Sequence, residues 1–425
     1  MLAGRTFASG PLRGTTTVPG DKSISHRAAI VAACSGGVVE IVGVNPGRDV
    51  RATLAALEAL GVRIERSGDD IAVHSKPLHT TAATLDCMNS GSTARMLLGA
   101  CAGAGIAARF DGDASLRARP MEPVAAQLRA FGARIETTHG RLPATFFGTA
   151  PVGTRHFILI EPSAQVKSAL LFAAAFAGVG VTIAGDRGSR DHTERLLRFF
   201  GATVQWDERR VTFSPAPFKP QAVAIPGDFS AAAFFITAAA IAPGSAIVVR
   251  DVGVNPTRTG LLDALLQMGA GIEVRDRREV CGEPVADIAV EHAPLQALAI
   301  GPDLALRAID EIPLLAVAAA FARGQTRIAD VGRLRAKESD RVAAIERLLS
   351  AAGIATDLQR NALTIAGGAP RPPTAPIETH GDHRVVMAAA VLAAGAGPVS
   401  VDDARSEDVS FPGFGSALER LRAFR

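Results

Sequence analysis

Six short polar clusters hold most of the residues in this sequence that could carry out chemistry. Each cluster lies at the start of an Ala-rich apolar segment that predicts a helix, and so at a helix N-terminus. Free backbone N–H groups and the positive end of the helix dipole attract anions there. The clusters comprise Lys22, Ser23 and Arg27; Asn89, Ser90 and Arg95; Ser163, Gln165 and Lys167; Asp228 and Ser230; Asp310 and Glu311; and Asp382, His383 and Arg384.

Two interpretations of these clusters compete. Ser, Asn and Asp are common N-caps, and capping accounts for Ser163, Asp228 and Asp310. Capping does not account for cations in or beside a first turn, because the helix dipole disfavours them there. Such cations are Lys22, Arg27, Arg95, Lys167 and Arg384. A bound anion would compensate both these cations and the dipole, so the clusters indicate anion binding.

Three segments outside these helices add further cations. They are residues 116–121 (LRARPM), which predict a Pro-bounded loop with Arg117 and Arg119; residues 187–195 (RGSRDHTER), with Ser189 and Arg190; and residues 335–341 (RAKESDR), with Lys337, Glu338 and Arg341. Each run alone is typical of a solvated surface. Together with the helix starts they predict a cleft in which arginine forks and a lysine charge hold phosphate or carboxylate groups.

The elements that position these clusters form an internal repeat. The six Ala-rich segments each continue through a turn into a β-branched strand, and they begin about 70 residues apart. A second motif recurs between them, an amphipathic helix that ends at a glycine and is followed by a strand. Its glycines are Gly61, Gly132, Gly201, Gly269 and Gly353, and a sixth copy (LERLRAF) is cut off after its helix. We therefore expect six α/β units, whose grouping the repetition alone leaves open.

Length and composition indicate a soluble globular protein of two or three domains. The 425 residues are 48% apolar and 20% charged, and a net charge of +3 is too small to indicate nucleic-acid or anionic-membrane binding. Residues 229–249 carry no charge, but Pro243-Gly244-Ser245 interrupts them, so we expect a helix, a turn and a buried strand. The start lacks a signal-peptide apolar region, and the four cysteines predict buried residues inside apolar helices or strands. These features predict a cytoplasmic protein.

Two short motifs resemble known sites but lack the context that those sites need. GAGIAA (residues 103–108) matches a dinucleotide-binding fingerprint, yet it follows a helix and precedes a strand, the reverse of the required order. HGDH (residues 380–383) could supply two metal ligands, but no third ligand at a recognised spacing accompanies it. We therefore expect neither a nucleotide cofactor nor a metal.

Nine segments together resemble EPSP synthases (3-phosphoshikimate 1-carboxyvinyltransferases), in family order from residue 20 to residue 384. SAQVKSA (163–169) and RDHTE (190–194) resemble the second class of that family, which includes glyphosate-tolerant members. The other segments are GDKSISHR (20–27), NSGSTAR (89–95), LRARP (116–120), NPTRTG (255–260), DEIP (310–313), RAKESDR (335–341) and HGDHR (380–384).

The resemblance implies that phosphoenolpyruvate and shikimate 3-phosphate give 5-enolpyruvylshikimate 3-phosphate and phosphate, with no metal or organic cofactor. It implies an α/β fold, a two-domain inside-out barrel of six pseudo-symmetric repeats, three per domain, with the active site in the interdomain cleft. Residues 20–225 would form an inserted domain on the shikimate 3-phosphate side, and residues 1–19 with 226–425 a discontinuous domain on the phosphoenolpyruvate side. The implied partners are these two small molecules, without nucleic acid or membrane, and the protein would be a monomer of the shikimate pathway.

The resemblance also assigns roles residue by residue. Asp310 would accept the proton of the attacking 5-hydroxyl, and Glu338 with Lys22 would transfer protons at the methylene carbon, since addition across an enol double bond needs a base and an acid. Shikimate 3-phosphate would be bound by Lys22, Ser23, Arg27, Ser163, Ala164, Gln165, Arg190, Asp310 and Lys337. Phosphoenolpyruvate would be bound by Lys22, Asn89, Gly91, Arg119, Gln165, Arg341 and Arg384.

Three positions depart from parts of the family. The chain has no Tyr to place near shikimate, and Arg190 would substitute for it, as in the second class. Val409 precedes Ser-Phe-Pro where some members have Lys, which puts one phosphoenolpyruvate contact in doubt. Gly91 stands where tolerant second-class members can have Ala, and because no methyl group crowds the longer inhibitor there, we predict sensitivity to glyphosate.

Two alternative functions are disfavoured by particular features. UDP-N-acetylglucosamine enolpyruvyl transferases resemble the expected fold but place a Cys on the loop where LRARP (116–120) stands, and residues 113–123 contain no Cys. A non-catalytic repeat scaffold would keep similar exposed residues from unit to unit. In this sequence the helix starts differ while the Ala-rich halves agree, which favours one asymmetric site.

Overall fold

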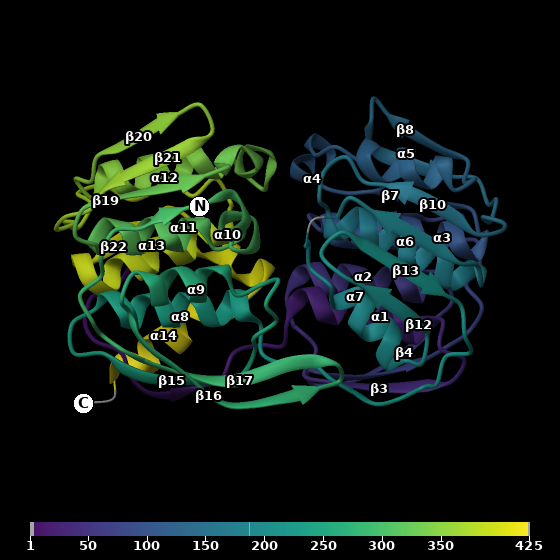
Figure 1. The fold of residues 1–425 in the computed structure, drawn as a ribbon, viewed down its shortest axis with the longest axis horizontal. Coiled ribbons are helices and arrows are strands. Elements are labelled where there is room, and N and C mark those ends of the chain that lie inside the picture. The colour runs from purple at the N-terminus through teal and green to yellow at the C-terminus, as the bar shows by residue number, and fades with distance from the viewer. Residues whose placement is uncertain (1–3, 187, 424–425) are drawn as a thin grey trace. The chain divides into compact units, whose positions relative to one another are not determined.

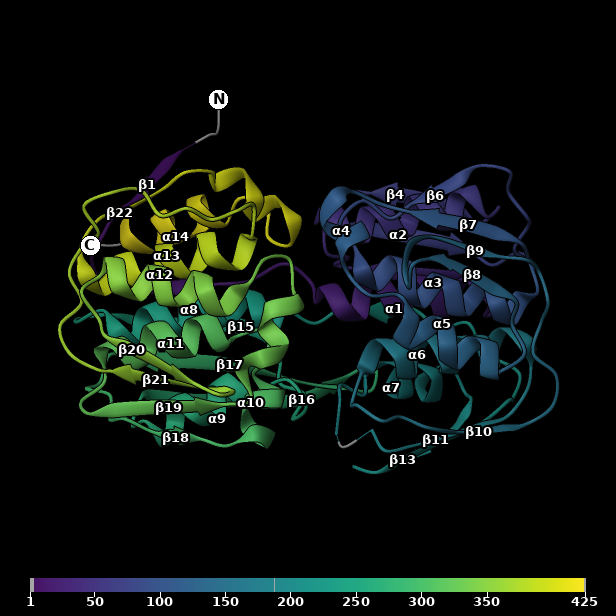
Figure 2. The same ribbon diagram turned by 90° about the horizontal axis from the view of Figure 1, so that it is seen from above.

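The structure is a computed structural model that describes residues 4–186 and 188–423. It is a mixed helix and strand protein that divides into two compact units, each described by itself below (Figures 1 and 2). Unit 1 contains Met1–Pro19, Pro226–Arg278 and Pro284–Arg425. Unit 2 contains Gly20–Ile225 and Glu279–Glu283.

Unit 2 repeats one order of elements three times: a helix, a strand, one or two further helices, and two strands. The first copy is α1 (Lys22–Ala33), β3 (Val38–Val42), α2 (Arg48–Ala59), β4 (Arg63–Ser67) and β5 (Asp70–His74), followed by β6 (Thr84–Asp86). The second is α3 (Gly91–Ala104), β7 (Ala108–Asp111), α4 (Ala114–Ala118), α5 (Glu122–Ala130), β8 (Ile135–Thr138) and β9 (Arg141–Phe146), followed by β10 (Arg155–Ile158). The third is α6 (Ala164–Ala177), β11 (Val181–Ala184), α7 (His192–Phe199), β12 (Thr203–Trp206) and β13 (Arg210–Ser214), followed by β14 (Val223–Ala224).

Unit 1 begins with two strands, β1 (Arg5–Phe7) and β2 (Arg13–Thr16), and shows the same order in two copies and, up to its last helix, in a third. Its first copy is α8 (Phe229–Ile241), β15 (Ala246–Gly253), α9 (Gly260–Gln267), β16 (Gly271–Val280) and β17 (Glu283–Glu291), followed by β18 (Ala299–Ile300) and α10 (Pro302–Arg307). The second is α11 (Ile312–Phe321), β19 (Gln325–Ala329), η1 (Val331–Ala336), α12 (Arg341–Ala351), β20 (Thr356–Gln359) and β21 (Ala362–Ala366). The third is α13 (His383–Ala396), β22 (Val399–Val401), η2 (Ala404–Val409) and α14 (Phe414–Ala423).

Five four-stranded sheets share one topology. Their strand orders are β14-β3-β5-β4, β6-β7-β9-β8, β10-β11-β13-β12, β2-β15-β17-β16 and β18-β19-β21-β20. In each sheet the first strand runs parallel to the second, which is in turn antiparallel to the third. The short β22 pairs instead with β1 from the N-terminal end of the chain, in a two-stranded sheet. All these sheets are open, and none of them closes into a barrel within the described residues.

The predicted helix starts are confirmed. All six Ala-rich helices begin within two residues of their polar clusters, and the side chain of Asp21, Ser90, Ser163, Asp228 or Asp382 caps five of them. The expected cap at Asp310 is wrong, because the N-cap position of α11 is Glu311 and no side chain of the described residues caps this helix. The five predicted glycines all have positive φ, between 77° and 109°, and each follows its amphipathic helix by two residues. Glycine is favoured at these exits because the left-handed backbone conformation strains side chains with a Cβ.

Small residues let the Ala-rich helices pack closely. In unit 2, a Cβ added to Gly99 on α3 would lie 2.7 Å from Ala169 Cα on α6, so only glycine fits there. In unit 1, α8, α11 and α13 pack against one another (Figure 2), and every residue of α8 is buried. Close packing of these helices brings their N-termini, and therefore the polar clusters, near one another within each unit.

The uncharged segment 229–249 has the expected structure. It forms α8, a turn at Gly244 with a φ of 81°, and the start of β15. Among residues 4–186 and 188–423, no helix combines the length and apolar character that a membrane span needs.

Three details differ from the expectations. Glu279–Glu283, expected with 226–425, belong to unit 2, because this tip of the β16–β17 hairpin contacts that unit: Arg195 Nη1 donates to Gly282 O over 2.9 Å. Residues 116–121 are not a simple loop, since α4 extends to Ala118 after its cap at Asp113. Of the four cysteines only Cys101 lies inside a helix; Cys34 caps α1, Cys87 follows β6, and Cys281 occupies the hairpin turn.

Candidate active site

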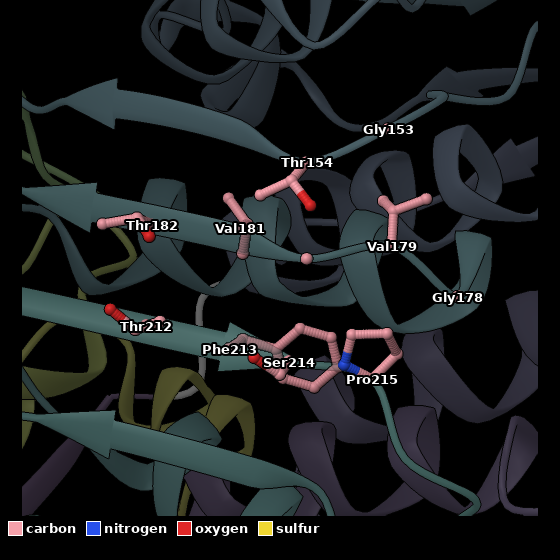
Figure 3. A pocket seen from close by; sticks show the side chains of 11 residues that line it. Gly153, Thr154, Gly178, Val179, Val181, Thr182, Thr212, Phe213, Ser214 and Pro215 are labelled. Atoms are coloured by element: carbon pink, nitrogen blue, oxygen red, sulfur yellow. The ribbon is translucent and has the colours of Figure 1, made fainter.

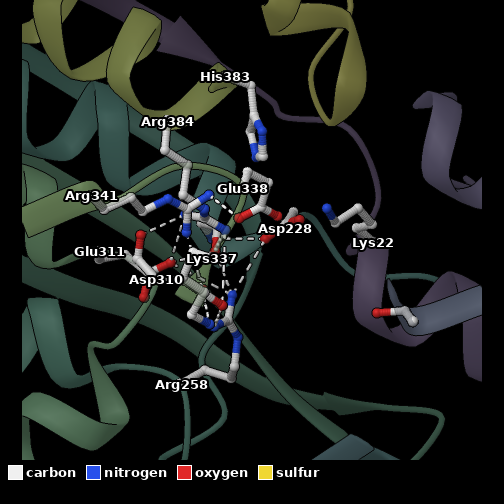
Figure 4. A network of polar contacts seen from close by, with 12 residues as sticks. Lys22, Asp228, Arg258, Asp310, Glu311, Lys337, Glu338, Arg341, His383 and Arg384 are labelled. Atoms are coloured by element: carbon white, nitrogen blue, oxygen red, sulfur yellow. Dashed lines mark hydrogen bonds and ion pairs between the residues drawn. The ribbon is translucent and has the colours of Figure 1, made fainter. Parts of the chain in front are cut away.

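In unit 1, the carboxylate of Asp310 is surrounded by four cationic side chains (Figure 4). Lys337 Nζ donates a hydrogen bond to Asp310 Oδ1 over 3.2 Å. Guanidinium nitrogens of Arg258 and Arg341 lie 3.8 Å from its oxygens, and one of Arg384 lies 4.0 Å away. The Asp310 side chain is 13% exposed, so a ligand can reach this carboxylate and the cations around it.

Arg341 is held from both sides at the first residue of α12. Its Nε and Nη2 atoms donate to the carboxylate of Asp382 over 2.8 and 3.2 Å, and Nη2 also lies 2.6 Å from Glu338 Oε2. Burial alone would lower the pKa of Arg341, but the charges of Asp382 and Glu338 outweigh burial and raise it. Arg341 is therefore a fixed, permanently charged group beside Asp310, while Glu338 is 22% exposed and accessible.

Arg384 and Arg258 share partners at the starts of α8 and α11. Arg384 Nη1 donates to Asp310 O over 2.8 Å and lies 3.3 Å from Glu311 Oε1, and its Nη2 donates to Ser230 Oγ over 3.3 Å. Arg258 Nη2 also donates to Ser230 Oγ and lies 3.7 Å from Glu311 Oε1. The three helix starts of unit 1 are thus joined by one charged network (Figure 4).

In unit 2, the start of α1 supplies Lys22, Ser23 and Arg27. Lys22 Nζ donates to Asp49 Oδ2 over 2.8 Å, and its side chain remains 17% exposed. Arg27 is 3% exposed, and its Nη1 atom donates to Ser23 O over 2.8 Å. Burial and the neighbouring charge of Arg190 lower the pKa of Arg27 to about 10. Arg27 therefore stays charged at neutral pH and lies close enough to Arg190 for the two to repel each other.

The start of α3 and the connection after α4 form a second group in unit 2. Asn89 Oδ1 accepts a hydrogen bond from Arg119 Nη2. A Cβ on Gly91 would meet the guanidinium group of Arg95 and lie 3.7 Å from Arg119 Nη1. Arg95 Nη1 donates to Gln165 Oε1 over 2.9 Å, which links this group to the start of α6. Asn89, Gly91, Arg119 and Gln165, all expected at the phosphoenolpyruvate site, therefore lie together.

The start of α6 carries the remaining expected residues of unit 2. Ser163 is the N-cap and accepts from Val166 N over 3.4 Å, and Ala164 is the first helical residue. For Lys167 the anion-binding interpretation is wrong, because its ammonium group is fully buried between Asp186 and Glu194, at 2.6 Å from each. Arg187, at the start of the expected 187–195 segment, lies outside the described residues.

The sequence did not single out two residues that contact this machinery. Asp49, the partner of Lys22, is an acidic residue in the first turn of α2, where such residues are common for helix stability alone. Arg258 lies in the quoted segment NPTRTG, but nothing in its spacing pointed to Asp310. Both contacts join side chains on different segments of the chain, and sequence periodicity cannot reveal which side chains meet.

The surface pocket drawn in Figure 3 is a different feature. It is lined by the ends of β11 and β13, including Thr154, Val181 and Phe213, and none of its lining residues is charged. Two anionic substrates need cations, so this pocket does not match the chemistry of the clusters. In the described part of the chain, no three or more His, Cys, Asp and Glu side chains are arranged to hold a metal ion.

Comparison with known proteins identifies the family. Residues 7–418 match the family model "EPSP synthase (3-phosphoshikimate 1-carboxyvinyltransferase)". The 3-phosphoshikimate 1-carboxyvinyltransferase of Desulforudis audaxviator is 46% identical, covering 97% of both chains, and that of Anaeromyxobacter is 44% identical, covering 97% of this chain and 96% of the relative.

Solved structures agree with this match. EPSP synthase from Acinetobacter baumannii has a TM-score of 0.85 at 35% identity, over 98% of both chains. The enolpyruvyl transferase NikO from Streptomyces tendae shares the fold, with a TM-score of 0.77 at 18% identity over 98% of this chain and 96% of its own. The family model and relatives above 40% identity span almost the whole chain, so this protein belongs to the EPSP synthase family.

Proposed function

We propose that this enzyme transfers the enolpyruvyl group of phosphoenolpyruvate to the 5-hydroxyl of shikimate 3-phosphate. The observation that carries the proposal is the Asp310 carboxylate with Lys337, Arg341, Arg384 and Arg258 around it, in a chain that belongs to the EPSP synthase family. A base beside a set of cations suits a reaction between a hydroxyl group and a phosphorylated enol. The product serves the shikimate pathway to aromatic amino acids.

The reaction proceeds by addition and elimination. Asp310 accepts the proton of the 5-hydroxyl as its oxygen bonds to C2 of phosphoenolpyruvate, and C3 gains a proton in the step served by Glu338 and Lys22. The resulting tetrahedral intermediate carries a methyl group, a carboxylate, a phosphate and the new ether at C2. Loss of a methyl proton and of phosphate then restores the double bond. The buried cations stabilise the charges that develop, so side chains supply the catalysis and no metal or organic cofactor is required.

The remaining residues bind the substrates. Phosphoenolpyruvate is held by Lys22, Asn89, Gly91, Arg119, Gln165, Arg341 and Arg384. Shikimate 3-phosphate is held by Lys22, Ser23, Arg27, Ser163, Ala164, Gln165, Arg190, Asp310 and Lys337. The pairing of Arg27 with Arg190 supports this assignment, because two neighbouring guanidinium groups suit a phosphate dianion.

We also propose how the repeats are arranged and where the enzyme is located. The shared sheet topology and element order support six pseudo-symmetric repeats in two inside-out barrels. One is formed by residues 20–225 with 279–283, and the other by residues 1–19, 226–278 and 284–425. Four unpaired cysteines support a reducing compartment, and we place the enzyme in the cytoplasm as a monomer that binds no nucleic acid or membrane.

Phosphate release tests the proposal. The purified protein, dialysed against a chelator, is incubated with phosphoenolpyruvate alone, with added shikimate 3-phosphate, or with added UDP-N-acetylglucosamine. We expect release only with shikimate 3-phosphate, and a loss of about 100-fold or more in Asp310→Ala. Release with UDP-N-acetylglucosamine would instead assign the rival enolpyruvyl transfer, and no release with either would refute an enolpyruvyl transferase.

A further inference from the structure

Three oxygen atoms of the protein surround the ammonium group of Lys167. Its Nζ atom lies 2.6 Å from Asp186 Oδ2, 2.6 Å from Glu194 Oε1 and 3.2 Å from the backbone oxygen of Ser189. Lys167 donates hydrogen bonds to Asp186 and to the backbone oxygen of Ser189, and it forms an ion pair with Glu194, whose oxygens accept no hydrogen bond within the described residues. The side chain is 1% exposed, so Lys167 does not touch a substrate, although it lies in the first turn of α6.

The partners of Lys167 lie on the elements that carry Arg190. Glu194 is in the first turn of α7, and Asp186 and Ser189 lie on the connection between β11 and α7. The hydroxyl of Ser189 donates to the second oxygen of Asp186. Ser189 is therefore fixed through both its carbonyl and its hydroxyl, and Arg190 is the next residue in the chain.

Residues next to this cluster in the chain also bind Arg27. Arg27 Nε donates to Thr193 Oγ1 over 2.8 Å, and Nη2 donates to Ser168 Oγ over 3.0 Å. Thr193 and Ser168 directly neighbour Glu194 and Lys167 in the chain. Arg190 lowers the pKa of Arg27 whereas Glu194 raises it, so the carboxylate opposes the repulsion between the two arginines.

Stability alone does not account for this cluster. Two carboxylates and an ammonium group, exposed by 2%, 0% and 1%, have lost their hydration, and apolar residues of similar volume stabilise a core as well or better. Burial lowers the pKa of Lys167, but the two carboxylates outweigh burial and raise it, so the ammonium group stays charged. A buried charge with two hydrogen bonds and a close ion pair specifies a geometry, which an apolar cluster would not do.

We propose that Lys167 is a positioning residue for shikimate 3-phosphate: it clamps Ser189 and Glu194 so that Arg190 is held beside Arg27. This inference rests on the proposed function, in which both arginines bind that substrate. Lys167 acts through its three partners and takes no part in the chemical step, so its loss raises the KM for shikimate 3-phosphate and leaves the KM for phosphoenolpyruvate almost unchanged.

Two variants separate geometry from charge. The cluster of Lys167, Asp186 and Glu194 carries a net charge of −1 when all three groups are ionised. The double variant Lys167→Met/Glu194→Gln keeps this net charge but removes the clamp. Glu194→Gln alone changes the net charge to zero but keeps the clamp, because the hydrogen bonds from Lys167 Nζ to Asp186 and to Ser189 O remain and an amide oxygen replaces the carboxylate oxygen beside it.

A third variant controls for loss of stability. Leu171→Ala lies one helical turn further along the same face of α6 and is fully buried, so it lowers the melting temperature without touching the clamp. A purely structural role for Lys167 would make the double variant resemble Leu171→Ala, with less active protein and an unchanged KM for shikimate 3-phosphate.

The single tryptophan provides a readout that is independent of turnover. Trp206 Nε1 donates to Asp191 Oδ2 over 3.2 Å, and Asp191 directly follows Arg190 in the chain. The fluorescence of Trp206 therefore reports on this segment. Titration with shikimate 3-phosphate alone gives the Kd, and phosphate release gives both KM values. We expect the Kd and KM for shikimate 3-phosphate to rise about tenfold or more in the double variant and about threefold or less in Glu194→Gln.

The opposite pattern would overturn the inference. If the double variant binds shikimate 3-phosphate like the wild type, or if Glu194→Gln is the more impaired of the two, Lys167 serves charge balance and not position. If the wild-type protein neither binds shikimate 3-phosphate nor releases phosphate with it, the proposed function fails and the inference falls with it. The wild-type result therefore distinguishes the two failures.

Discussion

Replacing Asp382 by Asn tests whether the buried network of unit 1 holds the catalytic cations in place. Asp382 is fully buried and accepts four hydrogen bonds, from Arg341 Nε and Nη2, Ser339 Oγ and Arg384 N. Each carboxylate oxygen faces two donors, so the amide NH2 group of Asn must face two donors wherever it points. The substitution also removes one of the carboxylates that balance Arg341, which is 1% exposed and keeps Glu338 and Asp310 nearby.

The size of the effect follows from this burial. Breaking a buried ion pair on one side costs about 3–5 kcal/mol. For a unit of this size each kcal/mol lowers the melting temperature by about 2–4 °C, so we expect unit 1 to melt about 6–20 °C lower. Because Arg341 and Arg384 lose a shared anchor, we also expect the KM for phosphoenolpyruvate to rise about tenfold or more.

Asp340→Asn is the matched control. Asp340 caps α12 by accepting from Ala343 N over 3.1 Å, but its side chain is 40% exposed. Asn caps helices as well as Asp, and an exposed ion pair contributes about 1 kcal/mol at most, so this variant should stay near the wild type. Differential scanning calorimetry and initial rates compare the two. Equal melting temperatures and equal KM values for Asp382→Asn and Asp340→Asn would refute the reasoning.

Acid provides an internal check on the same variant. Burial raises the pKa of Asp382, but the positive charge of Arg341 lowers it by more than burial raises it. The net shift of this pKa is therefore downward. A lowered pKa in the folded state means that the stability from this group is present above the unfolded value of about 3.9 and is lost as the pH falls below it. The difference in stability between the wild type and Asp382→Asn should therefore become smaller below about pH 4. A difference that stays constant there would show that charge is not its source.

Three further outcomes are expected. Gly91→Ala places a methyl group against the Arg95 guanidinium group. In steady-state inhibition assays, the wild type should be sensitive to glyphosate, and the variant should be less sensitive and have a raised KM for phosphoenolpyruvate. A glyphosate-resistant wild type would contradict this prediction. Gly99→Ala forces α3 away from Ala169 on α6, so its melting temperature should fall by several degrees, and an unchanged value would show that the helices can separate freely. Burial, with the charges of Lys22 and Arg27, lowers the pKa of His26. As the pH falls, the unfolded chain therefore binds a proton at His26 before the folded chain does, and the stability of the folded state should decrease below about pH 6.5. A His26→Gln variant whose stability has the same pH dependence would refute that assignment.

Local structure could be predicted from the sequence because it depends on neighbouring residues. The glycines after the amphipathic helices and the caps at Ser163 and Asp228 were predicted correctly, since backbone strain and orphan N–H groups are local problems. The turn at Gly244 could be predicted for the same reason. Apolar periodicity and capping residues together determine these elements without any knowledge of the tertiary fold.

Pairing between distant side chains could not be predicted. A lysine in a first turn has the same sequence signal whether it binds a substrate or pairs with acids, and only the fold places Asp186 and Glu194 around Lys167. The pairs Lys22 with Asp49 and Arg258 with Asp310 likewise join residues on different segments of the chain. The sequence therefore located the polar clusters but not which of their charges are already neutralised.

Solvent deuterium tests the central claim most directly. If the 5-hydroxyl adds to C2 while C3 gains a proton, the intermediate has a methyl group that later loses one of three hydrogens. In D2O, with both substrates present, we predict deuterium on the vinyl carbon of the product by mass spectrometry and NMR, and neither product nor label with Asp310→Ala. Enolpyruvyl product without deuterium at that carbon would contradict addition and elimination, and with it the roles assigned to Asp310, Glu338 and Lys22.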